Sequence, residues 1–274
     1  MKITKSMLED LHACAEGKEW FDTNFPEGGE YQTVLDKLGV ENNLQYAEWL
    51  MDRIPSDDSI LEIDEIKIDG SLFFAGKVVV KKGISVTGYL KAGRSIEAGW
   101  GIQAGRGIEA GSGIEAGDAI QAGWGIEAGL GIKAGRSIEA GSGIQAGWGI
   151  QAGLGIKAGD AIQAGWGIQA GSGIQAGRAI EAGSGIQAGW AIQAGWAIQA
   201  GDAIKAGDAI QAGRSIEAGS GIQAGWGIQA GLGIKAGDAI QAGWGIQAGL
   251  GIKAGRSIEA GRGIQAGRAI EEVA

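Results

Sequence analysis

The chain has 274 residues, of which 55 are Gly and only 2 are Pro, and a formal net charge of −9. A single Cys excludes an internal disulfide framework and fits a reducing compartment. No apolar stretch approaches the roughly 18 residues of a membrane-spanning helix, and the N-terminus lacks an apolar signal segment. We therefore expect a cytoplasmic protein with no membrane partner.

The spacing of apolar residues predicts a helical head over residues 1–54. Apolar residues recur at helical spacing around residues 7–11, 31–38 and 46–50, and Ser6 with Glu9 fits a capping box at the first of these segments. The pattern predicts three helices. They either close the first coil of the structure that follows or present a docking surface for a partner.

The rest of the chain is a hexapeptide repeat. Thirty consecutive hexads run over residues 91–270, each reading Glu/Gln/Lys, Ala, Gly, a variable residue, Gly/Ser/Ala, Ile. A short fixed period is typical of a solenoid. The apolar phase continues backwards in steps of six to Ile60, so we expect a solenoid over residues 55–270, followed by a tail over residues 271–274.

Each hexad must contain a corner. Strict strand alternation would turn the variable position inward and bury its eight Arg and five Asp without partners, which costs several kcal/mol per charge. The alternation therefore breaks at Ala-Gly, where Gly accepts a positive φ and allows neighbouring backbones to approach closely. The simplest closed cross-section has three sides, or eighteen residues per coil.

The order of charges supports eighteen residues per coil. In that register no Arg stacks on Arg and no Asp on Asp, whereas a twelve-residue coil would stack Arg94 on Arg106. A coil of twenty-four residues passes the same test, but eighteen also produces an unbroken Gln ladder from Gln175 to Gln265. We predict an all-β fold, a three-sided parallel β-helix of about twelve coils with a small α-helical N-terminal cap.

Catalytic residues are missing from the repeats. Residues 91–270 contain no His, Cys, Thr or Tyr, so general-base and nucleophilic groups are absent there. The single histidine, His12, and the single cysteine, Cys14, lie in the head and are interpreted as an incidental pair on a helix. We expect no enzyme activity, no metal and no cofactor.

Eight Trp share the variable position with the Arg residues. Exposed Trp and Arg are enriched at binding hot spots. In the eighteen-residue register two Trp pairs stack, and one Trp lies between two Arg, so the same residues also fit ladders that only stabilise neighbouring coils. Both interpretations stay open for the candidate partner-binding residues Trp148, Trp166, Trp190, Trp196, Trp226, Trp244, Arg178 and Arg214.

Charge is concentrated at one end of the chain. Residues 1–90 carry 17 acidic against 9 basic residues, whereas the thirty hexads carry 13 acidic against 14 basic residues. Only the acidic end could imitate the negative field of a DNA duplex, and we expect no direct nucleic-acid binding. The candidate residues for such mimicry are Asp57, Asp58, Glu62, Asp64 and Glu65.

Three segments of the head resemble a known module. The sequence Ala-Cys-Ala-Glu-Gly at residues 13–17 with Trp20-Phe21, the segment at residues 25–31 and the segment at residues 46–50 are similar to a short helical module of phage and prophage proteins. The repeats resemble hexapeptide-repeat solenoids, bactofilin-type polymer-forming solenoids and pentapeptide-repeat proteins, some of which inhibit host enzymes by mimicking DNA. This chain departs from the pentapeptide family in its period of six and its nearly neutral rod.

The missing catalytic residues, the surplus of outward Trp and Arg and these resemblances together lead to three candidate functions. The first is a non-enzymatic, phage-encoded rod that occupies a host protein complex for defence or nucleic-acid processing, such as a CRISPR effector, in the cytoplasm of a bacterial cell. The second is a filament-forming structural protein, and the third is a DNA mimic that acts through the acidic head.

The C-terminal coils predict a homodimer. The hexads run to Ile270 without a capping segment, which leaves strand edges and core residues open to a second copy. We expect a tail-to-tail dimer with two-fold symmetry. Its candidate residues are Ile258, Ile264, Ile270, Arg262 and Arg268.

Overall fold

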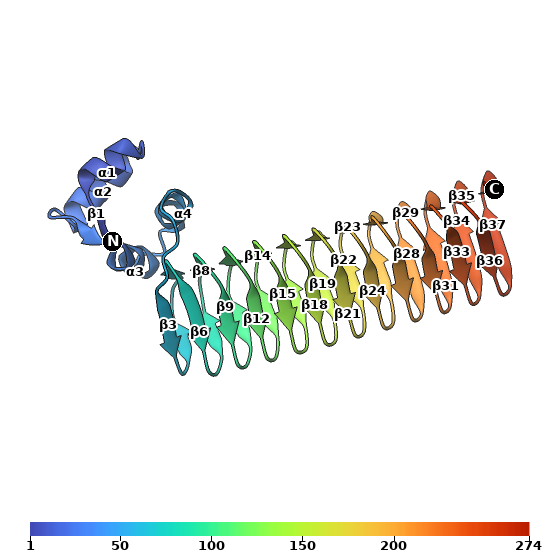
Figure 1. Cartoon of the computed structure of the whole chain (residues 1–274), viewed down its shortest axis with the longest axis horizontal. Coiled ribbons are helices and arrows are strands. Elements are labelled where there is room, and N and C mark those ends of the chain that lie inside the picture. Colours follow the sequence, from blue (N-terminus) through green and yellow to red (C-terminus); the bar gives the residue numbers. More distant parts are fainter. Residues whose placement is uncertain (274) are drawn as a thin grey trace.

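The computed structural model describes residues 1–273 and contains a helical head followed by a long β-solenoid (Figure 1). Three parallel sheets of twelve strands each form the sides of the rod, and each coil contributes one strand to every sheet. Residues eighteen apart are paired, as Ile102 is with Ile120. The predicted three-sided parallel β-helix of about twelve coils is confirmed.

The head contains four helices instead of the predicted three. Its elements are β1 (Lys2–Ile3), α1 (Lys5–Asp10), α2 (Ala15–Asn24), β2 (Gly29–Glu30), α3 (Tyr31–Val40) and α4 (Leu44–Arg53). The first predicted helix is a pair, α1 and α2, separated by a turn in which His12 has a φ of 60°. The predicted capping box is also wrong, because Thr4 caps α1 by accepting a hydrogen bond from the Met7 amide at 3.3 Å.

The strands of the solenoid are short and regular. The first six are β3 (Ile60–Ile63), β4 (Ile66–Ile68), β5 (Leu72–Phe74), β6 (Lys77–Val80), β7 (Ile84–Val86) and β8 (Leu90–Ala92). From β9 (Ile96–Ala98) to β22 (Ile174–Ala176) every strand covers Ile, the outward residue and Ala. From β23 (Ala179–Ala182) many strands begin one residue earlier, and the last three are β36 (Ser257–Ala260), β37 (Gly263–Ala266) and β38 (Ala269–Glu272). Ala274, the end of the predicted tail, lies outside the described residues.

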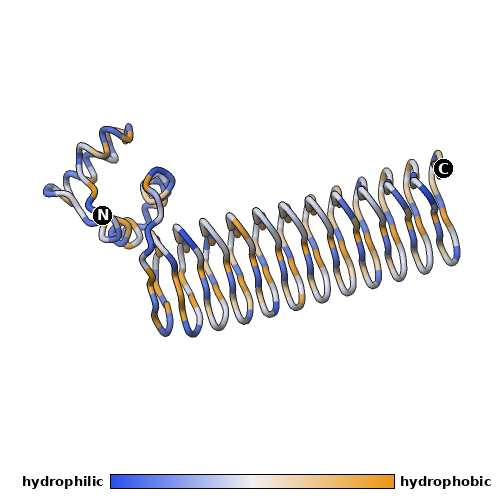
Figure 2. Tube along the Cα trace, in the orientation of Figure 1, coloured by the Kyte–Doolittle hydropathy of each residue, from blue (hydrophilic) through white to orange (hydrophobic). Residues whose placement is uncertain are grey.

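In the hexads up to Ile258 the Ile and Ala side chains are buried, and the residue between them points outward. Apolar and polar segments therefore alternate around every coil (Figure 2). The chain turns at Gly, as predicted, but no repeat glycine in residues 91–273 has a positive φ. Close approach is the reason for Gly: a Cβ at Gly177 would overlap the carbonyl oxygen of Gly159 in the preceding coil.

The first coil is one residue shorter than the others. Leu61 pairs with Val78, and Ile60 pairs with Lys77, so Leu61 packs against the core in place of Ile60. Ile60 points outward and is 61% exposed. The predicted inward position of Ile60 is therefore wrong.

The head covers one side of the first coil. Gln32 of α3 pairs with β5 as a further strand would, because its amide donates to the Phe73 carbonyl at 2.8 Å and accepts from the Ala75 amide at 3.0 Å. In the described residues β3 and β4 have no strand partner on the side facing the head. Ile63 and Ile68 remain exposed there, so the head closes one side of three.

A charged cluster also connects the head to the rod. Lys91 of β8 forms ion pairs with Asp52 of α4 at 3.5 Å and with Glu109 at 3.1 Å. Burial acts to lower the pKa of Lys91, but the carboxylates of Glu109, Asp52 and Glu48 together outweigh it and the pKa is raised. For Glu48 of α4, burial together with the nearby Glu109 raises the pKa of the carboxyl group.

Candidate functional site

The variable residues form three ridges along the corners of the rod. Ridge A runs in steps of eighteen from Arg94 to Arg256, ridge B from Trp100 to Arg262, and ridge C from Arg106 to Arg268. The sheet that contains β4, β7 and β37 lies between ridges B and C. Its outward residues include the predicted ladder of six Gln, and we call that part of the sheet the Gln face. It contains Gln175, Gln193, Gln211, Gln229, Gln247 and Gln265.

Most candidate partner-binding residues flank the Gln face. Six of the eight lie along its two edges, Trp190, Trp226 and Trp244 on ridge B and Arg178, Trp196 and Arg214 on ridge C. Trp148 and Trp166 lie on ridge A, at the corner opposite this sheet. The structure therefore gathers six candidates around one face and separates the other two from it.

The predicted stacking within the ridges is confirmed. The Trp226 and Trp244 rings are 4.7 Å apart and nearly parallel, and Arg262 covers the outer face of Trp244 at 3.4 Å. Trp148 and Trp166 stack at 5.6 Å. On ridge C the guanidinium groups of Arg178 and Arg214 lie 5.2 and 4.8 Å from the ring of Trp196. These rings stabilise neighbouring coils along the rod.

Trp190 differs from these stacked residues. Its side chain is 68% exposed, and no aromatic or cation–π pair in the described residues includes it. Ser172 and Asp208 are its neighbours along ridge B, so no ring or guanidinium covers its faces. Trp100 lies on the same ridge, is 58% exposed and is equally unstacked. It is not among the candidate partner-binding residues. The sequence does contain a signal for its exposure, because the residue eighteen positions later is Asp118, which has no ring to stack on it.

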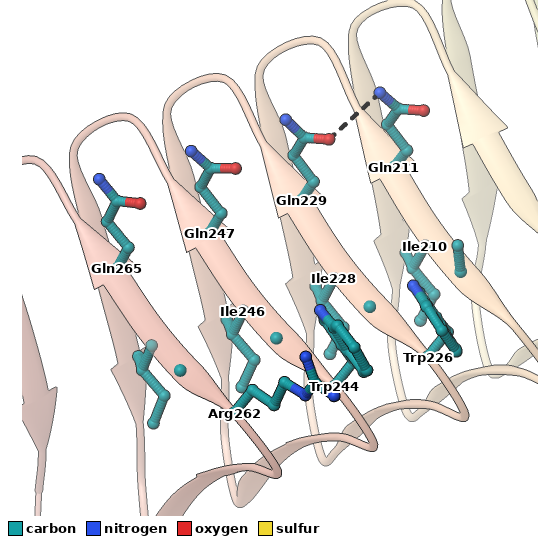
Figure 3. Close-up of a pocket in the computed structure, with 15 residues that line it drawn as sticks. Ile210, Gln211, Trp226, Ile228, Gln229, Trp244, Ile246, Gln247, Arg262 and Gln265 are labelled. Carbon is teal, nitrogen blue, oxygen red and sulfur yellow. Dashed lines mark hydrogen bonds between the residues drawn. The ribbon is translucent and has the colours of Figure 1, made fainter.

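A shallow groove of about 510 Å³ runs along the Gln face beside ridge B (Figure 3). Trp226, Trp244 and Arg262 form one wall, the Gln side chains form the other, and backbone at Gly227 and Gly245 lies between them. In this wall Gln211 donates to Gln229 at 3.4 Å, and Gln193, one coil earlier, donates to Gln211 at 3.3 Å. The groove thus combines an aromatic wall with a wall of uncharged amides.

The acidic cluster is largely paired within the chain. Asp58 forms an ion pair with Arg94, Asp64 with Lys81 at 3.2 Å, and Glu65 with Lys67 at 2.9 Å. The hydrogen bond from Lys67 lowers the pKa of Glu65. Asp57 accepts a hydrogen bond from the Ser59 amide at 3.0 Å, and Glu62 is exposed. Local cations therefore reduce the negative field that DNA mimicry needs.

The candidate dimer residues lie in the last coil with unequal exposure. Ile258 is buried, Ile264 is half-buried and Ile270 is 49% exposed. Arg268 is exposed, whereas Arg262 is engaged with Trp244. Glu272 accepts a hydrogen bond from the Ile258 amide at 3.0 Å and so caps part of the β36 edge. The homodimer stays a prediction.

The single histidine and the single cysteine lie close together in the head, next to one pocket. His12 lies in the exposed turn between α1 and α2, while Cys14 caps α2 by accepting a hydrogen bond from the Gly17 amide at 3.3 Å, so the two do not share a helix. Both border a pocket of about 220 Å³ lined by aromatic rings, including Trp20 and Trp49. In residues 1–273 no three His, Cys, Asp or Glu side chains are grouped to hold a metal ion. None of the described helices is long and apolar enough to span a membrane.

Comparison with known proteins assigns the head alone. Residues 1–56 match the family described as the YdhT N-terminal domain, which includes all four helices. No curated protein and no solved structure shows significant similarity to the chain. The chain is therefore a β-solenoid with a head similar to YdhT N-terminal domains.

Proposed function

We propose that this chain is a non-enzymatic rod that binds a protein complex of a bacterial host through the Gln face and its flanking ridges. In this proposal the chain is phage-encoded and inhibits a nucleic-acid-processing or defence complex, such as a CRISPR effector, in the host cytoplasm. The helical module in the head supports the phage origin, and the absence of His, Cys, Thr and Tyr from residues 91–270 supports a binding role.

The observation that carries the proposal is the exposure of Trp190. Its ring faces are uncovered, which leaves a large apolar surface in water on a corner that needs no aromatic residue. The same position holds Ser in five hexads, for example at Ser172, so the fold does not require Trp there. Trp226 and Trp244 lie farther along the same ridge, beyond Asp208 and beside the groove.

Matched serine variants test this surface. Trp190→Ser with Trp226→Ser removes two side chains from ridge B, and Trp148→Ser with Trp166→Ser removes two from ridge A. Because a single hot-spot Trp contributes about 2 kcal/mol or more, the ridge B variant should weaken partner capture by at least roughly 30-fold even when only one of its two Trp is a hot spot. Capture from host lysate and protection of a targeted phage in CRISPR-active cells are the measurements. Equal binding and protection by both variants would contradict the proposal.

A filament-forming role is the second candidate. The strands β3 and β4 have free edges at the head end of the solenoid, and unprotected edges allow strands of another chain to add. Concentration-dependent filaments in electron micrographs support this role, and a monodisperse short rod in X-ray scattering rejects it. The tail-to-tail dimer also remains a proposal, tested below through Ile264. The ion pairs of the acidic cluster count against the third candidate, DNA mimicry.

A further inference from the structure

The Gln face is unusual among the three faces of this rod because it lacks charge. Six consecutive strands present Gln outward there, from Gln175 to Gln265. The longest uncharged runs on the other two faces are three strands, Gln151 to Gln187, and two strands, Gln145 and Gln163. Lys133 and Lys205 interrupt the first of these runs at both ends.

Charged side chains on an exposed sheet have a known effect. They prevent other sheets from stacking on it, because each charge would lose its water on contact. Flat stacks of in-register strands whose Gln side chains form ladders pack face to face in cross-β assemblies. The Gln face has the ladder and no charge among its six outward positions; the nearest charges lie on its edges, at Asp208, Arg178 and Arg214 among others.

The spacing of the ladder indicates the kind of surface that fits it. Gln side chains on successive coils are separated by the strand spacing of about 4.8 Å, whereas an extended chain laid along the rod presents side chains on one face only about every 6.8 Å. Another stack of β-strands presents side chains at the matching interval. A second copy of this chain has that interval and the same uncharged ladder.

We propose that two copies of the chain associate side by side through their Gln faces, with the two Gln ladders interleaved and with ridges B and C at the margins. Along ridge B the exposed Trp190 and the stacked Trp226 and Trp244 then extend the contact around the flat sheet. The inference goes beyond the proposed function and does not rest on any host partner. Self-association and the host complex would compete for the same face.

The size of the face determines the strength of the contact. Six strands cover about 29 Å along the rod, and one side of a coil is at most about 20 Å wide, so the flat area is roughly 600 Å² per copy. A stable interface buries about 800 Å² per partner. We therefore expect a reversible dimer that dissociates on dilution through the micromolar range.

Sedimentation velocity of the full-length chain between about 1 and 200 μM measures this association. The test variant carries Gln211→Lys and Gln247→Lys, and the control carries Gln169→Lys and Gln241→Lys on another face. Lys occupies the outward position natively, for example at Lys157, so both variants should fold. None of the four substituted positions has a Lys as its neighbour in register.

The expected result is a dimer in the wild type and the control, and at least a tenfold weaker dimer in the test variant because four Lys meet at the interface. A wild-type monomer at 200 μM overturns the proposal. Equal weakening in both variants, or in neither, overturns it as well. A dimer lost only with Ile264→Asp supports tail-to-tail pairing instead. Host capture is measured separately with the Trp variants, so its failure leaves this result unaffected.

Discussion

The contact at the Gly corner leads to a quantitative prediction for Gly177→Ala. A Cβ at this position overlaps the carbonyl oxygen of Gly159, so the two coils must separate locally. Two hydrogen bonds span this corner, from Gly177 to Ala158 at 3.2 Å and from Arg178 to Asp160 at 2.7 Å. Their loss costs about 1 kcal/mol each, and overpacking adds about 1–3 kcal/mol. The substitution should therefore destabilise the rod by about 3–5 kcal/mol.

The same coil provides the matched control. Gly173 lies just before β22, as Gly177 lies just after it, and a Cβ at Gly173 meets only the Ala191 carbonyl oxygen, at an ordinary 3.5 Å. Ala is native at the equivalent position in Ala161 and Ala191. Gly173→Ala should leave stability unchanged or raise it by about 0.4–1 kcal/mol, because the unfolded chain loses freedom.

Thermal unfolding followed by circular dichroism, together with amide hydrogen exchange, distinguishes the two variants. Gly177→Ala should lower Tm by about 6–20 °C, and the amides of Gly177 and Arg178 should lose protection before those of distant coils. Gly173→Ala should retain wild-type protection. If both variants melt together, close approach of the coils is not the reason for Gly at the corner.

Three further predictions concern the head and the last coil. Gln32→Leu leaves the Phe73 carbonyl and the Ala75 amide without partners and should cost about 2–4 kcal/mol in urea unfolding of the head; an unchanged midpoint contradicts this. The folded state raises the pKa of Glu48, so the ionised carboxylate is disfavoured there and Glu48→Gln should increase the free energy of unfolding at pH 7. This increase should disappear below the pKa of the unfolded chain, near 4.5, because the carboxyl group is then neutral in both states. A stabilisation that grows in acid refutes this assignment. Ile264→Asp should convert a tail-to-tail dimer to monomer by light scattering, and a wild-type monomer rejects that dimer.

The repeat made the solenoid predictable because one constraint applies thirty times. Arg and Asp at the variable position forced a corner in every hexad, and the separation of like charges at that position favoured eighteen residues per coil, although Glu109 pairs with Glu127 and Lys235 with Lys253 on the strands. The same register predicted which rings stack. The register would also have predicted that six candidates flank one face, because residues on one corner, such as Trp190 and Trp244, have numbers that differ by a multiple of eighteen.

Prediction failed where the repeat is imperfect. Ile60 and Leu61 are both apolar, so counting in sixes selected Ile60, although the five-residue step from Leu61 to Ile66 makes Leu61 the inward residue. The turn at His12 was missed because a positive φ in a residue other than Gly has no reliable sequence pattern. Both errors lie outside the regular hexads, where a pattern occurs only once and no second copy of it can confirm or exclude an assignment.

The equivalence of the three sides also affects how the sequence of such a rod can evolve. Each hexad buries the same Ile and Ala and turns at the same Gly, so inserting one hexad leaves the core intact but moves every later residue to the next corner. The segment from Arg136 to Gly171 recurs at Arg214 to Gly249, thirteen hexads later, and this shift carries the Trp148–Trp166 pair of ridge A to Trp226–Trp244 on ridge B. Gain or loss of hexads thus redistributes surface residues among the corners, and the protein can acquire a new surface pattern without any new amino acid.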